Sequence, residues 1–298
     1  MAQSASTHRA KCMRSILHPG EIAAERVQVV QTAAKQAELA LAPGRSLLDT
    51  LADALAPYGA TSAVLSLKGG SFFPFAYVMP ATSKTPDHAV YFSERFDAVG
   101  PARLEFGTVT YGQRDGRPWL HCHATWIESE GTRRCGHVLP DAAIISETLH
   151  ASVCLLEGAE FHVRPNAETN FPLFKPEPTA RRISEPSAKD SLAVRLAPNV
   201  DVCTAIEDIC LEHGISDATI QGGVGSIVGT VFDDGWTVDP FVTEVLIRSG
   251  RVREDPHGAP LAEIDVTLVD FTGNMAEGRL LRGANPVLVT FELVLVPV

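Results

Sequence analysis

Several features that would identify common classes of protein are missing from this sequence. The chain has six cysteines in 298 residues, and their spacing matches no disulfide framework. No apolar run is long enough to span a bilayer, and the polar residues 1–11 lack the apolar core of a secretory signal. We find no Ser-His-Asp order, nucleotide fingerprint or flavin motif. We therefore expect a cytoplasmic protein with reduced thiols and no membrane partner.

Positive charge is also scarce, because 25 Lys and Arg stand against 36 Asp and Glu, for a net charge of −11. Nucleic-acid-binding surfaces normally need a basic patch, so we expect no nucleic-acid partner. A hydrophobic content of 45% with 20% charged residues is typical of a folded globular protein. The length predicts two domains of ordinary size.

An internal repeat supports this two-part organisation. The segment 39–43 recurs as 194–198, and each copy leads into an amphipathic stretch that predicts a helix. Ser46 and Asp201 are the expected N-caps of these helices, and they occupy equivalent positions. In both copies a strand and a glycine turn are expected next, over 62–71 and 217–226.

The repeat then shifts register, because the first copy carries extra residues around Met79 to Phe92. This Pro-, Thr- and Ser-rich insertion predicts either a lid beside a site or simply a longer hairpin loop. We divide the chain into four parts: an N-terminal extension packing on the first domain (1–38), a first domain (39–164), a proline-rich linker (165–191) and a second domain (192–298). We expect a helical stretch near Val27–Ala40, beginning in the extension. Within the linker, we expect the apolar segment Asn170–Phe174 to dock on a domain.

Three histidines carry most of the chemical information. Residues 119–127 read as a strand, in which alternation places His121 and His123 on one face and Cys122 on the other. With His137 arriving from the next strand, they predict a three-nitrogen metal site, although ordinary strand histidines are the alternative. Zinc is our first choice, and iron, nickel, cobalt, copper or manganese also suit such ligands. Cys135 as a fourth ligand would close the site and favour a structural role.

The second copy lacks these ligands. By the repeat, His121 corresponds to Glu263, His123 to Asp265 and His137 to Arg279. An arginine in the third position argues against a cation, so we expect the second domain to be a degenerate partner without a metal.

The repeat unit resembles the plants-and-prokaryotes conserved (PPC) domain. The shared features are the Leu-Ala-Pro-Gly entry to a capped helix, the strand with His-x-His, and the Gly136–Leu139 segment. The resemblance implies an α/β fold, an antiparallel sheet flanked by helices, assembly as homotrimers, and a metal-binding role for the three histidines. Plant members carry DNA-associated AT-hooks, but the nearest match here, 114–118, contains the acidic Asp115.

Together these features favour a metal-dependent enzyme of the hydrolase, hydratase/lyase or isomerase type. We expect it to act on a small polar, carboxylated metabolite at a site near a subunit interface. Glu147 is the candidate general base and Lys68 the candidate carboxylate-binding residue, against the alternatives of an outward strand carboxylate and a surface lysine. A non-enzymatic ligand- or metal-binding regulatory protein is the second hypothesis, and a DNA-associated protein is the third.

Overall fold

The computed structural model describes residues 14–179 and 190–298, so part of the predicted N-terminal extension and part of the predicted linker lie outside it. The first half contains β1 (Val27–Leu41), α1 (Leu47–Leu55), η1 (Ala56–Tyr58), β2 (Ala63–Lys68), β3 (Ser71–Val78), β4 (Pro80–Thr82), β5 (Val90–Phe92), β6 (Phe96–Asp97), β7 (Ala102–Arg114), β8 (Arg117–Ile127), β9 (Arg133–Glu147), β10 (Leu149–Glu157), β11 (Ala159–Pro165) and β12 (Pro172–Pro178). The second half contains β13 (Ser191–Leu196), α2 (Val202–Glu212), β14 (Ala218–Val231), β15 (Thr237–Glu254), β16 (Pro260–Asp270), β17 (Met275–Arg279) and β18 (Val287–Pro297).

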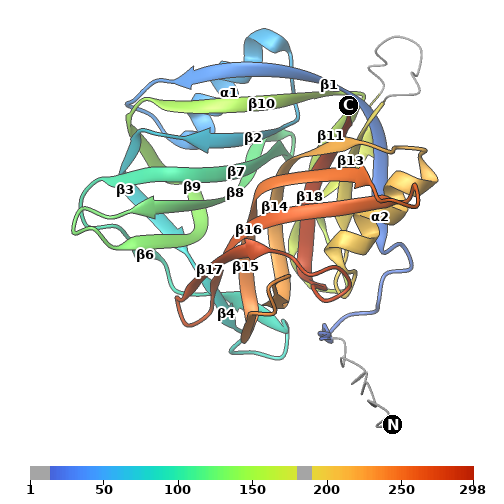
Figure 1. The fold of residues 1–298 in the computed structure, drawn as a ribbon. Helices are drawn as coiled ribbons and strands as arrows, with labels where there is room; N and C mark the ends of the chain where they lie inside the picture. Colours follow the sequence, from blue (N-terminus) through green and yellow to red (C-terminus); the bar gives the residue numbers. More distant parts are fainter. Residues whose placement is uncertain (1–13, 180–189) are drawn as a thin grey trace.

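Strands dominate the fold, and α1 and α2 are the α-helices of the described residues (Figure 1). The expected antiparallel sheet is confirmed, because nearly every strand pairing is antiparallel. The α/β label overstates the helical content, since long paired strands occupy most of the chain.

The internal repeat is visible in the strand order. One half of the sheet runs β17-β16-β15-β14-β18-β13, and the other half runs β9-β8-β7-β2-β10-β1. The orders match strand for strand, with β1 equivalent to β13 and β9 equivalent to β17. The halves meet where β1 pairs with β13, so one sheet crosses the whole molecule (Figure 1). Because the sheet is continuous, we describe two packed halves, and the division into two domains stays a prediction.

The predicted helix near Val27–Ala40 is wrong, because this segment forms the 15-residue strand β1. Its Ala, Gln, Lys and Glu residues favour helices, but propensity is a weak prior that tertiary pairing overrides. Residues 27–32 pair with β13 and residues 33–41 pair with β10, so this one strand joins the two halves.

The capped helices, by contrast, are confirmed. The Ser46 hydroxyl accepts a hydrogen bond from the Asp49 amide at 3.1 Å, and the Asp201 carboxylate accepts one from Thr204 at 2.9 Å. Leu47, Leu51 and Leu55 form the buried face of α1. Each helix therefore covers the core of its own half.

The two glycine segments behave differently. Gly69 and Gly70, both at φ of 66°, form the expected turn between β2 and β3. In the second half the expected turn is instead a bulge within the continuous strand β14, where the pairing with β18 shifts between Gly222 and Val224. A Cβ atom on Gly222 would lie 2.7 Å from the Val64 side chain, so the bulge brings the two halves into close contact.

The insertion near Met79 to Phe92 forms the small hairpin β4–β5, a two-stranded sheet of its own.

The apolar segment Asn170–Phe174 docks on the fold as predicted, because Phe171 and Phe174 are buried and residues 172–178 pair with β11. Each half has its own core, and further clusters contain residues of both halves, such as Val64 with Val294 and Cys135 with Leu246. The halves are thus held together by apolar contacts as well as by strand pairing.

Within the described residues, neither helix has the length and apolar character that crossing a bilayer requires. The five cysteines of this part of the chain are free and buried.

Candidate metal centre

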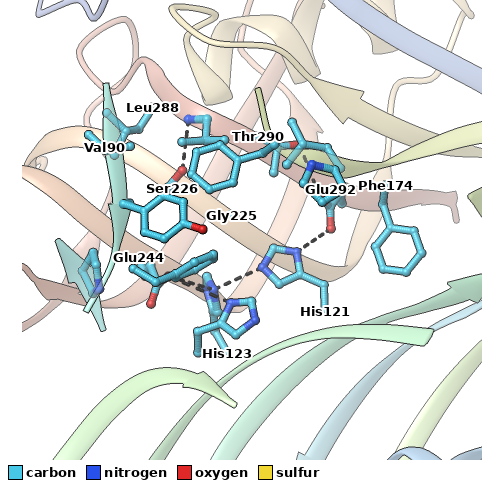
Figure 2. A pocket seen from close by; sticks show the side chains of 18 of the residues that line it. Val90, His121, His123, Phe174, Gly225, Ser226, Glu244, Leu288, Thr290 and Glu292 are labelled. Carbon is cyan, nitrogen blue, oxygen red and sulfur yellow. Dashed lines mark hydrogen bonds and ion pairs between the residues drawn. The ribbon is translucent and has the colours of Figure 1, made fainter. Parts of the chain in front are cut away.

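The three histidines converge as the sequence predicts. His121 and His123 lie on β8, and His137 on β9 is paired directly with His123. One ligand atom from each ring lies within 4.8 Å of those from the other two. Cys122 points to the opposite face, into the core of the first half, where it is fully buried. Strand alternation therefore places all three imidazoles on the face that packs against the second half (Figure 2).

Two of the rings are oriented by partners from the second half. His123 Nδ1 lies 2.9 Å from the carbonyl oxygen of Val245, and His121 Nδ1 lies 2.8 Å from Glu292 Oε2. Because both acceptors require a proton on Nδ1, the Nε2 atoms are left with lone pairs. Metal-binding histidines in proteins usually have this arrangement, in which one ring nitrogen donates a hydrogen bond and the other is free to bind the metal.

The two Nε2 atoms lie 3.2 Å apart. Burial, together with the neighbouring His121 and His137, lowers the pKa of His123 well below 6.5 and favours its neutral ring. This contact is a hydrogen bond if one Nε2 carries a proton, and a cation between two unprotonated Nε2 atoms would satisfy both lone pairs. Two nitrogens bound tetrahedrally to one zinc at about 2.0–2.1 Å would be about 3.3 Å apart, so the observed spacing fits shared coordination.

Glu244 of β15 lies beside this cluster and was not predicted from the sequence. Its Oε1 lies 3.9 Å from both His123 Nε2 and His137 Nδ1. Both Glu244 Oε2 and His137 Nδ1 are buried and have no hydrogen-bond partner among the described residues. Burial raises the pKa of the Glu244 carboxyl well above its usual value and lowers that of His137. Buried polar atoms without partners are costly, and a bound cation would satisfy both.

A second missed residue, Glu292 of β18, is itself held in place. The Thr290 hydroxyl donates to Glu292 Oε1 at 3.3 Å and accepts from Arg195 Nε at 3.1 Å. Arg195 is 4% exposed, so a buried positive charge lies beside this carboxylate. The sequence does contain a signal for Glu292, which is the single charged residue of an otherwise apolar strand, whereas β15 carries several charged residues besides Glu244.

A cavity of about 300 Å³ opens over the histidines and is lined by both halves of the chain (Figure 2). The first half contributes the histidines and a set of aromatic side chains, including Phe92, Trp119, Phe171 and Phe174. The second half contributes Glu244, Leu288, Thr290 and Glu292. The hairpin β4–β5 supplies Phe92, whose ring contacts that of His137 at a centroid distance of 5.0 Å. The insertion is therefore a hairpin that also forms one wall of the site.

The remaining predicted site residues lie elsewhere. Lys68 is exposed at the end of β2, and Glu147 is exposed at the end of β9, where it accepts a hydrogen bond from Ser71. Neither lines the cavity, so the structure does not bring these two candidate catalytic residues to the histidines. Cys135 is buried among Leu246, Val269 and other apolar side chains, and burial raises the pKa of its thiol. It is not part of the histidine cluster.

The equivalent positions in the second half form a salt-bridge cluster. Asp265 and Arg279 are paired on β16 and β17 as His123 and His137 are on β8 and β9. Arg279 lies 3.0 Å from Asp265 and 3.2 Å from Glu263. The guanidinium forms ion pairs with both carboxylates, and the absence of a metal from this half stays a prediction.

Comparison with known proteins identifies the second half. Residues 183–298 match the sequence profile of the Plants and Prokaryotes Conserved (PCC) domain. The predicted resemblance to this domain is thereby confirmed, although the matched residues are those of the half that lacks His121, His123 and His137. Among the curated proteins, none matches the chain.

Solved structures of low sequence identity each cover about half of the chain. A PPC protein from Pyrococcus horikoshii is 14% identical and covers 48% of this chain and 94% of its own, with a TM-score of 0.39. A metal-containing protein from Archaeoglobus fulgidus is 17% identical and covers 49% and 96%, with a TM-score of 0.40. A candidate DNA-binding protein from Ralstonia eutropha is 14% identical and covers 46% and 89%, with a TM-score of 0.35.

Proposed function

We propose that this chain, which contains a PCC domain over residues 183–298, is a metal-dependent enzyme acting on a small oxygen-bearing molecule. The observation that supports this most is the convergence of three histidines and the buried Glu244 on the floor of a cavity. A metal that only stabilised the fold would need no ligand-sized space above it. Ligand cavities of about 300–1,000 Å³ are typical of small-molecule sites.

The donor set suits a divalent transition metal, with zinc as the first choice. His121, His123 and His137 would hold it, and Glu244 faces the same point from the second half. A cation bound there would polarise an oxygen of the ligand or lower the pKa of a water molecule. Hydrolysis, hydration or elimination, and isomerisation are the reaction types that such activation serves.

The residues of this chain would perform three further tasks. Glu292 and the Val245 carbonyl fix the tautomers of His121 and His123. Glu244, with an unpartnered oxygen beside the cluster, can accept or donate a proton at the ligand. The aromatic side chains exclude water from the floor of the cavity, which strengthens charge interactions there. These walls also amend the predicted ligand, because they suit an apolar body better than a wholly polar metabolite.

A second candidate is a non-enzymatic protein in which the metal has four protein ligands. Glu244 favours this candidate, because a carboxylate bound directly to the metal would complete a closed tetrahedral site. It would take the role that the sequence analysis considered for Cys135.

Cobalt substitution distinguishes the two candidates. We would load the full chain with Co²⁺, record its visible absorption, and titrate acetohydroxamate, a small bidentate metal ligand. The proposed enzyme has an open position, so the cobalt bands should shift and saturate with acetohydroxamate. An unchanged spectrum at saturating acetohydroxamate would favour the closed site. Asp265→Ala, at the position equivalent to His123, is the matched control and should respond as the wild type does.

Assembly as homotrimers and a cytoplasmic location stay predictions.

A further inference from the structure

The cavity has Arg114 at its outer end and the three histidines at its inner end. We infer that its ligand is a carboxylic acid with a flat apolar body, whose acid group pairs with Arg114. The inner end of the ligand would face the histidines, and only that part of the inference rests on the proposed function. Arg114 stands at the tip of the β7–β8 hairpin and lines the cavity.

The spacing along β8 sets the shape of the ligand. Trp119, His121 and His123 alternate onto the same face of this strand, and all three line the cavity. At a rise of about 3.4 Å per residue, Trp119 lies about 7 Å from His121 and about 14 Å from His123 along the strand. A ligand that reaches from the histidines to Trp119 is therefore about the length of one substituted ring.

Arg114 is placed to receive an anion. Its guanidinium carbon lies 5.1 Å from the centre of the Trp119 ring, so the cation sits over the indole. Its one ion-pair partner within residues 14–179 and 190–298 is Asp115, at the limiting distance of 4.0 Å. The nearby Arg164, by contrast, is committed to two short hydrogen bonds with Glu177. Arg114 thus keeps donors for a planar carboxylate, which guanidinium groups bind in a bidentate manner.

The charges at the two ends differ in sign. Among the described residues that line the cavity, Arg114 alone carries positive charge, and the acidic Glu244 and Glu292 lie at the histidine end. Glu244 and Glu292 would offset the charge of a divalent cation bound at the histidines, whereas no acidic residue of the cavity lining faces Arg114. The ligand therefore enters with its acid group paired with Arg114 and presents its other polar group to the histidines.

Aromatic side chains occupy the space between the ends. Phe171 and Phe174 are buried, and Phe92 contacts both the His137 ring and Phe171, the latter at 5.9 Å. Together with Trp119 they form apolar walls that suit a flat body by stacking or edge contacts. A branched sugar or a free phosphate would leave these walls unused.

Two probes that differ only in the acid group test the inference. Calorimetric titration of the Zn²⁺-loaded full chain would compare benzohydroxamate with 4-carboxybenzohydroxamate. We expect the carboxylated probe to bind about tenfold more tightly, as a charge-assisted hydrogen bond at a partly exposed site allows. Arg114→Gln should remove that difference and leave benzohydroxamate unaffected. Arg117→Gln, in the same hairpin but outside the cavity lining, is the matched control and should keep the difference.

The inference is overturned if 4-carboxybenzohydroxamate gains nothing in the wild type, or keeps its gain in Arg114→Gln. Failure of the metal site has a separate signature, in which neither hydroxamate binds. In that case 3-phenylpropanoate, which needs no metal, tests the outer end alone. Weaker binding of 3-phenylpropanoate to Arg114→Gln than to the wild type would support the role of Arg114, and equal or absent binding would overturn it.

Discussion

His121 and Glu292 are joined by a 2.8 Å contact between Nδ1 and Oε2, although they belong to different halves of the chain. The half that has lost its own histidines thus orients a histidine of the other half. The Val245 carbonyl does the same for His123, and Glu244 lies 3.9 Å from both His123 and His137. The second half therefore contributes side chains and a backbone carbonyl to the site. Because the chain contains a repeat, one chain supplies both sides of the site.

Glu292→Gln should weaken metal binding while leaving the fold intact. Glutamine can still accept a hydrogen bond from His121, but it lacks the charge that increases the basicity of the ring. Loss of such an outer partner typically costs about 10–100-fold in metal affinity. Competition titration of Zn²⁺ against a chromophoric chelator would measure it. Glu263→Gln, which removes a carboxylate from the Arg279 cluster, should bind Zn²⁺ as tightly as the wild type.

Gly222→Ala should destabilise the protein more than Gly214→Ala. Both glycines have positive φ, at 70° and 64°, so alanine is strained in either place. Only at Gly222 would the new Cβ meet another side chain, that of Val64 at 2.7 Å, whereas nothing lies within 4 Å of it at Gly214. Overpacking costs about 1–3 kcal/mol beyond the shared strain. Urea unfolding of both variants would measure the difference, and equal losses would contradict the close contact of the halves.

His18 should contribute to the acid sensitivity of the fold. It is 5% exposed, and burial lowers its pKa below 6.5, while Nε2 contacts the Leu288 carbonyl at 2.7 Å. Below pH 6.5 the unfolded chain binds a proton here that the folded chain does not, so the stability that neutral His18 provides is complete above pH 6.5 and is lost as the pH falls. Through this one proton, the free energy of unfolding should change by at most about 1.4 kcal/mol per pH unit.

His18→Gln removes this dependence. Its free energy of unfolding should therefore lie further below that of the wild type at pH 7.5 than at pH 5.5. A constant gap between His18→Gln and the wild type would exclude the proposed contribution.

DNA should not retain this protein in a salt-dependent manner. With a net charge of −11, the chain offers few cations to displace the counterions of a duplex. Gel-shift or anisotropy titration with duplex DNA at low and at moderate salt would test this. Tight binding that weakens steeply with salt would contradict this prediction and support a DNA-associated function.

The sequence was sufficient to predict that His121, His123 and His137 converge, because they lie close together on adjacent strands. Strand alternation relates His121 to His123, and a hairpin relates His123 to His137, so local rules were enough. The caps Ser46 and Asp201 were found for the same reason. Glu244 and Glu292 could not be placed, because their positions depend on how the two halves pack, which no local pattern records.

The errors have a similar origin. Residues 27–40 have the composition of a helix, but β13 and β10 offer hydrogen-bonding edges on both sides, and pairing with them outweighs propensity. Lys68 lies beside the glycine turn at Gly69, and Glu147 follows His137 along the chain, so both were candidates by their place in the sequence alone. Both lie at strand ends, away from the cavity, where charged side chains are solvated.

Elemental analysis of tag-free protein purified without chelator tests the central claim most directly. We would compare the wild type with His123→Ala and with Asp265→Ala, the equivalent change in the second half. The account predicts about one divalent metal per chain in the wild type and in Asp265→Ala, and its loss in His123→Ala. A wild type without metal, or a metal content that His123→Ala leaves unchanged, would contradict the three-histidine site.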